Sequence, residues 1–393
     1  MKIFEDLKTF NFDWILLTIF LAIIGLGLIA LASASFAFGV NEHADAYYYL
    51  KNQMLALVIA LILFPIIALT PIKNYEKSSL ILLIAGIILL VLVFVPGLGQ
   101  TRNGSTRWID LGIITIQPSE VAKLFIGIYF CSYAYRHQEK LRSTFTGLLR
   151  PLGILIIAGG LLLKEPDFGS FLVLSSILLA VLYVGGARYL HMSLLFIGLL
   201  SLSYFLAFSE GYRIDRITSF LDPWADPFDT GFQLTQSLMA VGSGGLFGLG
   251  LGNSVQKLYY LPEAHTDFVF AVFAEEFGFI GTVLLLLLFL SLITRILFLS
   301  SKAIKQGQYF HGLLSFFLGI YLASSILLNI SVTIGLVPTK GLTLPFFSYG
   351  RSSYIVSMVI IFVVFRIFHE VERHVLIQRT QKEYRQTLMG KVQ

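Results

Sequence analysis

Acidic and imidazole side chains gather between residues 263 and 276 of a chain in which only 13% of the residues are charged. Glu263, His265 and Asp267 come at the start of a long apolar run. Partial burial at such a place raises the proton affinity of a carboxylate, which makes it a stronger base. Asp267, beside Glu263 and His265, is therefore a candidate for acid–base chemistry.

A structural role is the alternative for this segment. Thr266 or Asp267 would then act as the N-cap of the helix that follows. Glu275 and Glu276 lie two turns deeper in the same apolar run, and at least one of them is expected to face the protein interior.

Two further polar motifs open apolar segments. In QPSEVAKL (117–124), Glu120 and Lys123 are three positions apart, so they share a helix face and can pair. Ionisable groups inside a membrane span are costly and favour a functional role, with a structural ion pair as the alternative. In EPDFGS (165–170), Asp167 and Ser170 either belong to a polar site or cap a helix.

Basic and hydroxyl side chains alternate with prolines in VPTKGLTLPFFSYGRSSY (337–354). Lys340 and Arg351, with Ser348 and other Ser and Thr donors nearby, have the chemistry of an anion site, because ammonium and guanidinium groups bind phosphate oxygens. The alternative is that these two cations pair with the carboxylates of the 263–276 segment.

The elements that carry these motifs are predicted to be membrane helices. Hydrophobic residues make up 56% of the chain, and its mean hydropathy is +0.81. Continuous uncharged runs fit helices that cross a hydrocarbon core of about 30 Å, whereas a β-barrel would show short alternating segments. The fold class is therefore all-α, a polytopic integral membrane protein with about ten transmembrane helices. The expected spans are 14–34, 53–71, 79–97, 118–135, 147–163, 168–186, 189–208, 267–298, 309–336 and 352–369.

The first span has a signal peptide as its alternative, but its apolar run is longer than a signal peptide requires and nine more spans follow. Lys and Arg are more frequent in the segments on the side of the N-terminus, so both termini are expected in the cytoplasm. This asymmetry accounts for the pI of about 9.1, and nothing else supports nucleic-acid binding. The single cysteine, Cys131, lies within a span and forms no intramolecular disulfide.

We expect a single membrane domain over 1–393, with a large extracytoplasmic loop at 209–266 between spans seven and eight and a cytoplasmic tail at 370–393. A shorter outward loop covers 98–117. Within the large loop, 231–241 predicts a short amphipathic or re-entrant helix. The glycine-rich stretch 242–252 lacks the Gly-Lys-Ser/Thr context of a phosphate loop, which favours backbone flexibility or close approach to a lipid headgroup.

These stretches resemble the SEDS family of bacterial cell-wall polymerases (shape, elongation, division and sporulation proteins), and the match spans nearly the whole chain. The motifs DPWADPF and YLPEAHTDF are closer to those of the division member of the family than to those of the elongation member. The other carriers of the resemblance are STRWIDLG (105–112), QPSEVAKL (117–124), EPDFGS (165–170), LPEAHTDFVFAVFAEE (261–276) and GLVPTKGLTLPFFSYG (335–350).

The resemblance implies a peptidoglycan glycosyltransferase of the cytoplasmic (inner) membrane that polymerises lipid II at its outer face. Its implied partners are a class B penicillin-binding protein and other membrane proteins of the septal division complex. The essential acidic residue of the family falls on Asp267, the QPSE-xx-K motif on Glu120 and Lys123, and the outer-loop pair on Arg107 and Trp108. The chain departs from the family at the end of SYG, where Arg351 replaces the usual glycine.

An α-linked pyrophosphate that becomes a β-linked glycan implies inversion in one displacement. Asp267 is then the general base for the acceptor hydroxyl. The pyrophosphate would be held by cations, with a divalent cation (Mg²⁺ or Mn²⁺) as a helper for which the sequence shows no set of ligands. The expected substrate-binding residues are Arg107, Trp108, Glu120, Lys123, Glu263, His265, Lys340, Ser348 and Arg351.

Three alternatives stay open at this stage. A flippase or transporter of lipid-linked precursors would place its ionisable residues at the membrane midplane and show repeated halves, neither of which the sequence indicates. A structural scaffold for division would not need Asp267 or Lys123 in costly settings. An elongation-type polymerase would share the chemistry and differ in its partners.

Overall fold

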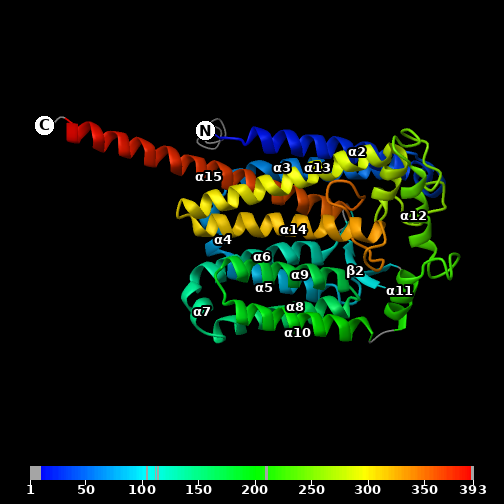
Figure 1. The fold of residues 1–393 in the computed structure, drawn as a ribbon, viewed down its shortest axis with the longest axis horizontal. Coiled ribbons are helices and arrows are strands. Elements are labelled where there is room, and N and C mark those ends of the chain that lie inside the picture. Colours follow the sequence, from blue (N-terminus) through cyan, green and yellow to red (C-terminus); the bar gives the residue numbers. More distant parts are fainter. Residues whose placement is uncertain (1–9, 103–104, 111, 113–114, 209–210, 391–393) are drawn as a thin grey trace.

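The computed structural model describes residues 10–102, 105–110, 112, 115–208 and 211–390. Its long helices run side by side in one bundle (Figure 1). The helices are α2 (Trp14–His43), α3 (Tyr48–Leu69), α4 (Ile72–Lys77), α5 (Ser79–Leu92), α6 (Pro118–Arg136), α7 (Gln138–Ser143), α8 (Thr146–Lys164), α9 (Phe168–Val184), α10 (Tyr189–Ala207), α11 (Gly211–Leu221), α12 (Phe232–Ser243), α13 (Val269–Lys305), α14 (Tyr309–Thr333) and α15 (Arg351–Gly390). The strands are β1 (Gly99–Arg102), β2 (Ser105–Asp110) and β3 (Thr115–Ile116).

A helix occupies each of the ten positions that the apolar runs predict. Within the described part of the chain, seven helices are long and apolar enough to cross a membrane, and α5 and α9 are shorter apolar helices. Apolar helices suit a bilayer because each satisfies its backbone hydrogen bonds internally. The polytopic helical class is therefore confirmed, and the number of crossings stays a prediction.

In three places the helix continues beyond the end of the predicted membrane span. The first helix continues to residue 43 and not 34, the eighth continues to 305 and not 298, and the last continues to 390. Hydropathy marks where a helix leaves the apolar region, whereas a helix ends where its backbone hydrogen bonds end. The expected tail at 370–393 is thus a direct extension of α15 through residue 390.

A small antiparallel sheet in the loop 98–117 adds strands that the sequence did not predict. Its order is β1-β2-β3, with Gln100 opposite Trp108 and Ile109 opposite Ile116. The β-branched and aromatic residues of STRWID favour extended backbone, but the segment is too short for its alternation to stand out in the sequence.

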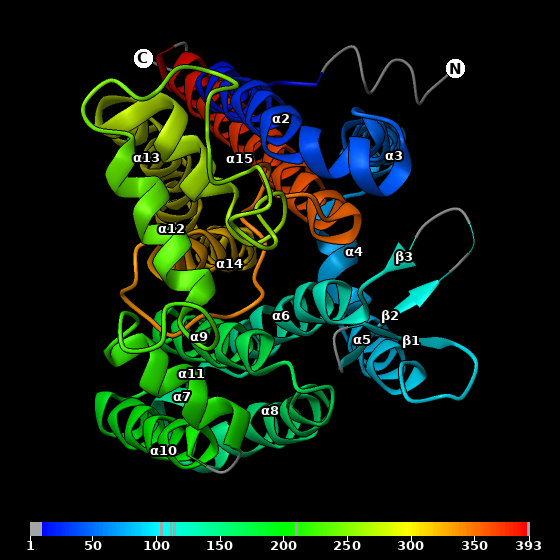
Figure 2. The same cartoon turned by 90° about the vertical axis from the view of Figure 1, so that its right-hand side faces the viewer.

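The two ends of the bundle differ in content. The sheet, α11 and α12 lie at one end, and Figure 2 looks onto this end. The short helices α4 and α7 lie at the other end, together with both ends of the described chain (Figure 1). This agrees with the prediction that both termini share a side, and which side faces the cytoplasm stays a prediction.

The large loop 209–266 contains two helices, α11 and α12, and the helix predicted at 231–241 is confirmed as α12. Its glycine-rich stretch packs on α13, where Gly278 breaks the helix with φ 67° and ψ −168°. The backbone N–H groups of Leu249 and Gly250 donate to the Glu275 and Glu276 carbonyls, each at 3.0 Å. These glycines serve a close backbone contact, because a Cβ on Gly278 would lie 2.2 Å from the Gly248 nitrogen.

Glu275 and Glu276 are both buried, which confirms that at least one faces the interior. The Glu276 carboxylate pairs with the Lys257 ammonium at 2.7 Å and accepts from the Ser33 hydroxyl at 2.6 Å. Glu275 accepts from the Ser254 hydroxyl and from the backbone of the same loop. The two carboxylates therefore fasten the loop that leads to Asp267 onto α13 and α2.

Candidate functional site

Asp267 lies in a tight turn, two residues before the start of α13. Glu263, at φ 55°, accepts backbone hydrogen bonds from residues 266, 267 and 268 on its carbonyl. The Thr266 hydroxyl donates to the Glu263 carboxylate at 2.6 Å. The N-cap position of α13 is Phe268, without a side-chain cap. The capping interpretation of Thr266 or Asp267 is therefore wrong, and the Asp267 carboxylate is left for another role.

The Asp267 carboxylate is half-buried, and no side chain or backbone group in the described ranges donates a hydrogen bond to it. Burial, followed by the negative charge of Glu263, raises the pKa of Asp267 to about 7. The guanidinium groups of Arg107 and Arg216 act in the opposite direction. A carboxylate with a pKa near the working pH is well matched to proton abstraction.

Arg107 comes from β2 and links the small sheet to the connection between α8 and α9. Its Nε donates to the Glu165 carbonyl at 3.1 Å, and its Nη2 donates to the Pro166 carbonyl at 2.5 Å. Trp108 is the next residue on β2 and is half-buried. The sheet thus places one of the predicted binding residues, Arg107, close enough to influence Asp267.

Arg216 is a cation of the site that was not predicted from the sequence. It lies on α11, and its Nη1 donates to the Thr339 carbonyl at 3.2 Å, in the loop before α15. Its charge lowers the pKa of Asp267, as that of Arg107 does. In the sequence it lies in the stretch YRIDRITSF (212–220), where nothing distinguishes it from the other arginine.

Glu165 is the second group that was missed. It is 1% exposed, and neither of its carboxylate oxygens has a hydrogen-bond partner among the described residues. Burial, assisted by the charge of Asp167, raises its pKa to about 8, against the effect of Arg107. At pH 7 Glu165 is therefore mostly a neutral acid. Asp167 itself caps α9 by accepting from the Ser170 N–H at 3.0 Å, which confirms the helix-cap alternative for EPDFGS.

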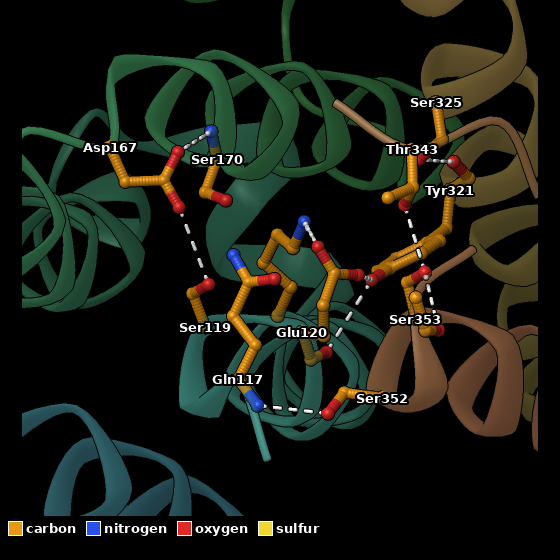
Figure 3. A network of polar contacts seen from close by, with 12 residues as sticks. Gln117, Ser119, Glu120, Asp167, Ser170, Tyr321, Ser325, Thr343, Ser352 and Ser353 are labelled. Carbon is orange, nitrogen blue, oxygen red and sulfur yellow. Dashed lines mark hydrogen bonds and ion pairs between the residues drawn. The ribbon is translucent and has the colours of Figure 1, made fainter. Parts of the chain in front are cut away.

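Glu120 and Lys123 form the centre of a buried polar network between α6, α14 and α15 (Figure 3). The Lys123 ammonium pairs with one Glu120 oxygen at 2.7 Å, and the Tyr321 hydroxyl donates to the other at 2.7 Å. The cavity beside them measures only about 10 Å³, too small for a phosphate group. The structural ion pair is thus observed, and substrate contact by either residue stays a prediction.

The loop between α14 and α15 carries the other predicted binding residues. Lys340 lies over the Phe168 ring, 4.0 Å from its centroid. Arg351 donates to the Thr115 hydroxyl at 3.1 Å, so it fastens β3 to the start of α15. The Ser348 hydroxyl accepts from the Leu344 N–H within the loop. A direct role with substrate stays a prediction for all three residues.

His265 packs into an aromatic cluster instead of turning toward the carboxylates. Its ring lies 4.8 Å from the Phe38 ring and 4.3 Å from the Tyr49 ring, between centroids. Its carbonyl accepts from the Tyr349 N–H at 2.9 Å, which joins the Asp267 turn to the loop before α15. Burial lowers the pKa of His265, so the ring is neutral near pH 7. These contacts give it a packing role, and a part in substrate binding stays a prediction.

Among the described residues, no group of three or more His, Cys, Asp or Glu side chains is placed to hold a metal ion. The divalent cation considered from chemistry alone remains an expectation.

Comparison with known proteins gives consistent matches over most of the chain. The profile of the cell cycle protein family FTSW_RODA_SPOVE matches residues 13–373. A protein of Coxiella burnetii named probable peptidoglycan glycosyltransferase FtsW is 44% identical, over 90% of this chain and 95% of its own length. A protein of the same name from Nitrosococcus halophilus is 45% identical, over 90% and 92%.

Two solved structures share the fold. One comes from a peptidoglycan synthase complex, described in terms of the structural coordination of polymerization and crosslinking. It has a TM-score of 0.74 and 28% identity, covering 92% of this chain and 98% of that chain. The other is the rod shape determining protein RodA of Thermus thermophilus, with a TM-score of 0.66 and 28% identity, covering 92% and 97%.

Proposed function

The chain belongs to the cell cycle protein family FTSW_RODA_SPOVE. We propose that the site around Asp267 polymerises lipid II with inversion at the anomeric carbon of the sugar. It is a multi-pass membrane protein and a division-type peptidoglycan glycosyltransferase, in line with the relatives that it matches. The observation that carries the proposed chemistry is the Asp267 carboxylate, which is half-buried, receives no hydrogen bond from the described residues, and is influenced by two arginines.

Asp267 acts as the general base in the proposed reaction. The acceptor hydroxyl gives its proton to the carboxylate while its oxygen attacks the anomeric carbon of the donor. The bond from that carbon to the pyrophosphate oxygen breaks on the opposite face, and the pyrophosphate leaves with the electron pair. A readily departing pyrophosphate needs no protein acid, so one carboxylate suffices, in contrast to the two of most glycosidases.

The negative charge that develops on the pyrophosphate requires cations at its side. Arg107 and Arg216 are proposed for this role because both lie near enough to Asp267 to lower its pKa. Lys340 joins them from the loop before α15, held over Phe168. The Glu120–Lys123 pair and Arg351 support the site through α6, α15 and β3, since their observed partners are protein groups.

The setting of the enzyme is part of the proposal. We place it in the inner membrane at the septum, with the site at the outer face and both termini in the cytoplasm. A class B penicillin-binding protein is the proposed partner, together with other membrane proteins of the division complex. The likeness to a chain from a peptidoglycan synthase complex supports such a pairing.

Purified protein with its penicillin-binding partner, given labelled lipid II in liposomes, is expected to produce glycan strands that gel electrophoresis resolves. Transfer of the labelled headgroup across the bilayer, scored by its accessibility to an impermeant quencher, should stay at the rate of protein-free liposomes. Headgroup transfer without strands would replace the polymerase by a transporter of lipid-linked precursor.

The rate of polymerisation is expected to depend on pH through Asp267. Because only the ionised carboxylate accepts a proton, kcat/KM should fall about tenfold per pH unit well below the pKa of about 7 and reach a plateau above it. Initial rates at subsaturating lipid II between pH 5 and 9 measure this. If kcat/KM instead fell only near pH 4, the ordinary range of an aspartate, the base would be a more exposed group.

A further inference from the structure

Asn329 is a buried amide on α14 that touches two segments of the candidate site. Its Nδ2 donates to the Asp267 carbonyl at 2.8 Å and to the Leu342 carbonyl at 2.5 Å. It is 1% exposed, and no motif in the sequence analysis included it. The Asn329 side chain therefore connects Asp267 to the loop before α15.

The orientation of this amide follows from its partners. Both are carbonyl oxygens, which only accept, so the NH₂ end of Asn329 must face them. Its Oδ1 is buried and has no partner among the described residues. An unsatisfied buried acceptor opposes folding, so an apolar residue at this position would be preferred if packing alone mattered. The two donated bonds are what an amide supplies here and an aliphatic side chain cannot.

The loop that Asn329 holds lies directly on the Asp267 carboxylate. A Cβ built on Gly341, next to Leu342, would be 3.1 Å from Asp267 Oδ2, closer than ordinary van der Waals contact. The Gly341 φ angle is outside the left-handed region, so its backbone does not require glycine. The absence of a side chain at 341 therefore matters for the space beside the carboxylate.

The loop is also held in place by the side chain of Leu342. Leu342 is 8% exposed, and its side chain packs on α9 so closely that a Cβ on Gly169 would lie 3.0 Å from it. The loop consequently has a fixed position on α9 at one side and on Asn329 at the other.

We propose that Asn329 is a positioning residue for the polymerase reaction, which fixes Asp267 and the 334–350 loop relative to each other. Gly341 is the position in that loop that leaves Oδ2 open to the acceptor hydroxyl. This inference rests on the proposed role of Asp267 as base.

Asn329→Leu removes both donated bonds and keeps the approximate volume of the side chain. Without these two hydrogen bonds, the loop and the Asp267 carboxylate are no longer held in a fixed relative position. A misplacement of about 1 Å costs roughly 10²-fold in rate. We expect kcat, per folded molecule, to fall by about that factor, with KM for lipid II within about threefold of the parent. Water that enters beside Asp267 stabilises its ionised form, so the acid limb of the pH profile should move to lower pH.

Gly341→Ala tests the same geometry without touching the buried amide. The added methyl group presses on Oδ2, so kcat should fall by about tenfold or more, while the melting temperature should change little, because the end of the Asp267 side chain can shift to relieve the contact. Because Gly341 is exposed, this variant remains informative even if Asn329→Leu is poorly folded.

Two matched controls separate positioning from stability. Ser315→Ala removes another buried hydrogen bond of α14, which the Ser315 hydroxyl donates to the Ile296 carbonyl on α13. This variant should have a lower melting temperature, with the kcat and the pH dependence of the rate unchanged. Gly153→Ala adds a methyl group to α8 where no atom lies within 4 Å, and should change neither.

The outcomes distinguish this inference from the function on which it rests. Asp267→Asn with full polymerisation would remove the base and the proposed mechanism. An inactive Asp267→Asn protein, together with Asn329→Leu and Gly341→Ala proteins that keep the kcat and pH limb of the parent, would overturn the positioning role alone. Loss of rate in both variants, with the controls unchanged, supports it.

Discussion

Asp267→Asn protein is expected to insert and fold normally and to make no measurable glycan from lipid II. An amide does not take up a proton at working pH, so the general-base contribution, typically about 10²–10⁴-fold, is lost. The substitution keeps the shape of the side chain. Polymerisation per folded molecule, measured with labelled lipid II beside the parent protein, gives the size of the loss.

The stability of this variant is expected to change in the opposite direction to its activity. The pKa of Asp267 is raised in the folded protein from its ordinary value of 3.8 to about 7, so the folded state loses stability as the pH rises between these two values and carries the full cost above about 7. The neutral amide of the variant has no such cost. Asp267→Asn protein should therefore melt at or above the temperature of the parent at pH 8. Below the ordinary aspartate pKa both residues are neutral, and the difference should vanish.

Asp267→Glu serves as the companion variant. It keeps the charge but moves the carboxylate by about 1 Å, which is enough to cost on the order of 10²-fold in a positioned site. Well-folded Asp267→Asn protein that polymerises normally would exclude Asp267 from the mechanism. Glu263, which lies in the same turn and whose carbonyl accepts from the Asp267 N–H, would then be the next carboxylate to test.

Lys123→Ala is expected to have the second largest effect, through folding. Lys123 is 1% exposed and its ammonium pairs with Glu120 at 2.7 Å, so its removal strands a buried carboxylate. Breaking one side of a buried pair typically costs about 3–5 kcal/mol. The melting temperature in detergent and the yield of monodisperse protein measure this loss.

The double variant Glu120→Gln with Lys123→Met is the matched control, because it removes both charges and keeps the volumes. The Tyr321 hydroxyl can still donate to the Gln carbonyl oxygen in place of the carboxylate. It should therefore be more stable than Lys123→Ala alone. If both proteins were equally well folded and equally inactive, Lys123 would instead act on the substrate.

The helical membrane fold was predictable because it depends on composition along the chain. A segment of about 20 apolar residues is stable in a bilayer only as a helix, whatever its neighbours are. The Glu120–Lys123 ion pair was predictable as well, because a spacing of three residues places both side chains on one face of a helix. Asp267 was found for a related reason, since a carboxylate at the edge of an apolar run is costly in any fold.

The small sheet and the true helix ends were not predictable at this level. Pairing of β1 with β2 depends on backbone partners that a short alternating segment does not specify. The glycine-rich stretch was ambiguous in the same way. Gly248 meets the backbone at the break at Gly278, on a helix that begins well after this stretch in the chain.

The composition of the site around Asp267 was decided by tertiary structure. Arg107 on β2 and Arg216 on α11 lower the pKa of Asp267 through their charge, and Asn329 on α14 donates to its backbone carbonyl. These three elements are distant in sequence. Glu165 is a buried acid whose carboxylate has no hydrogen-bond partner among the described residues, because Arg107 donates to the carbonyls of Glu165 and Pro166 and not to that carboxylate. Sequence determines which side chains are costly to place in a membrane, because that cost is local. Which cation or amide meets each of them depends on how the helices pack, and this is why the partners of Asp267 emerge only from the folded chain.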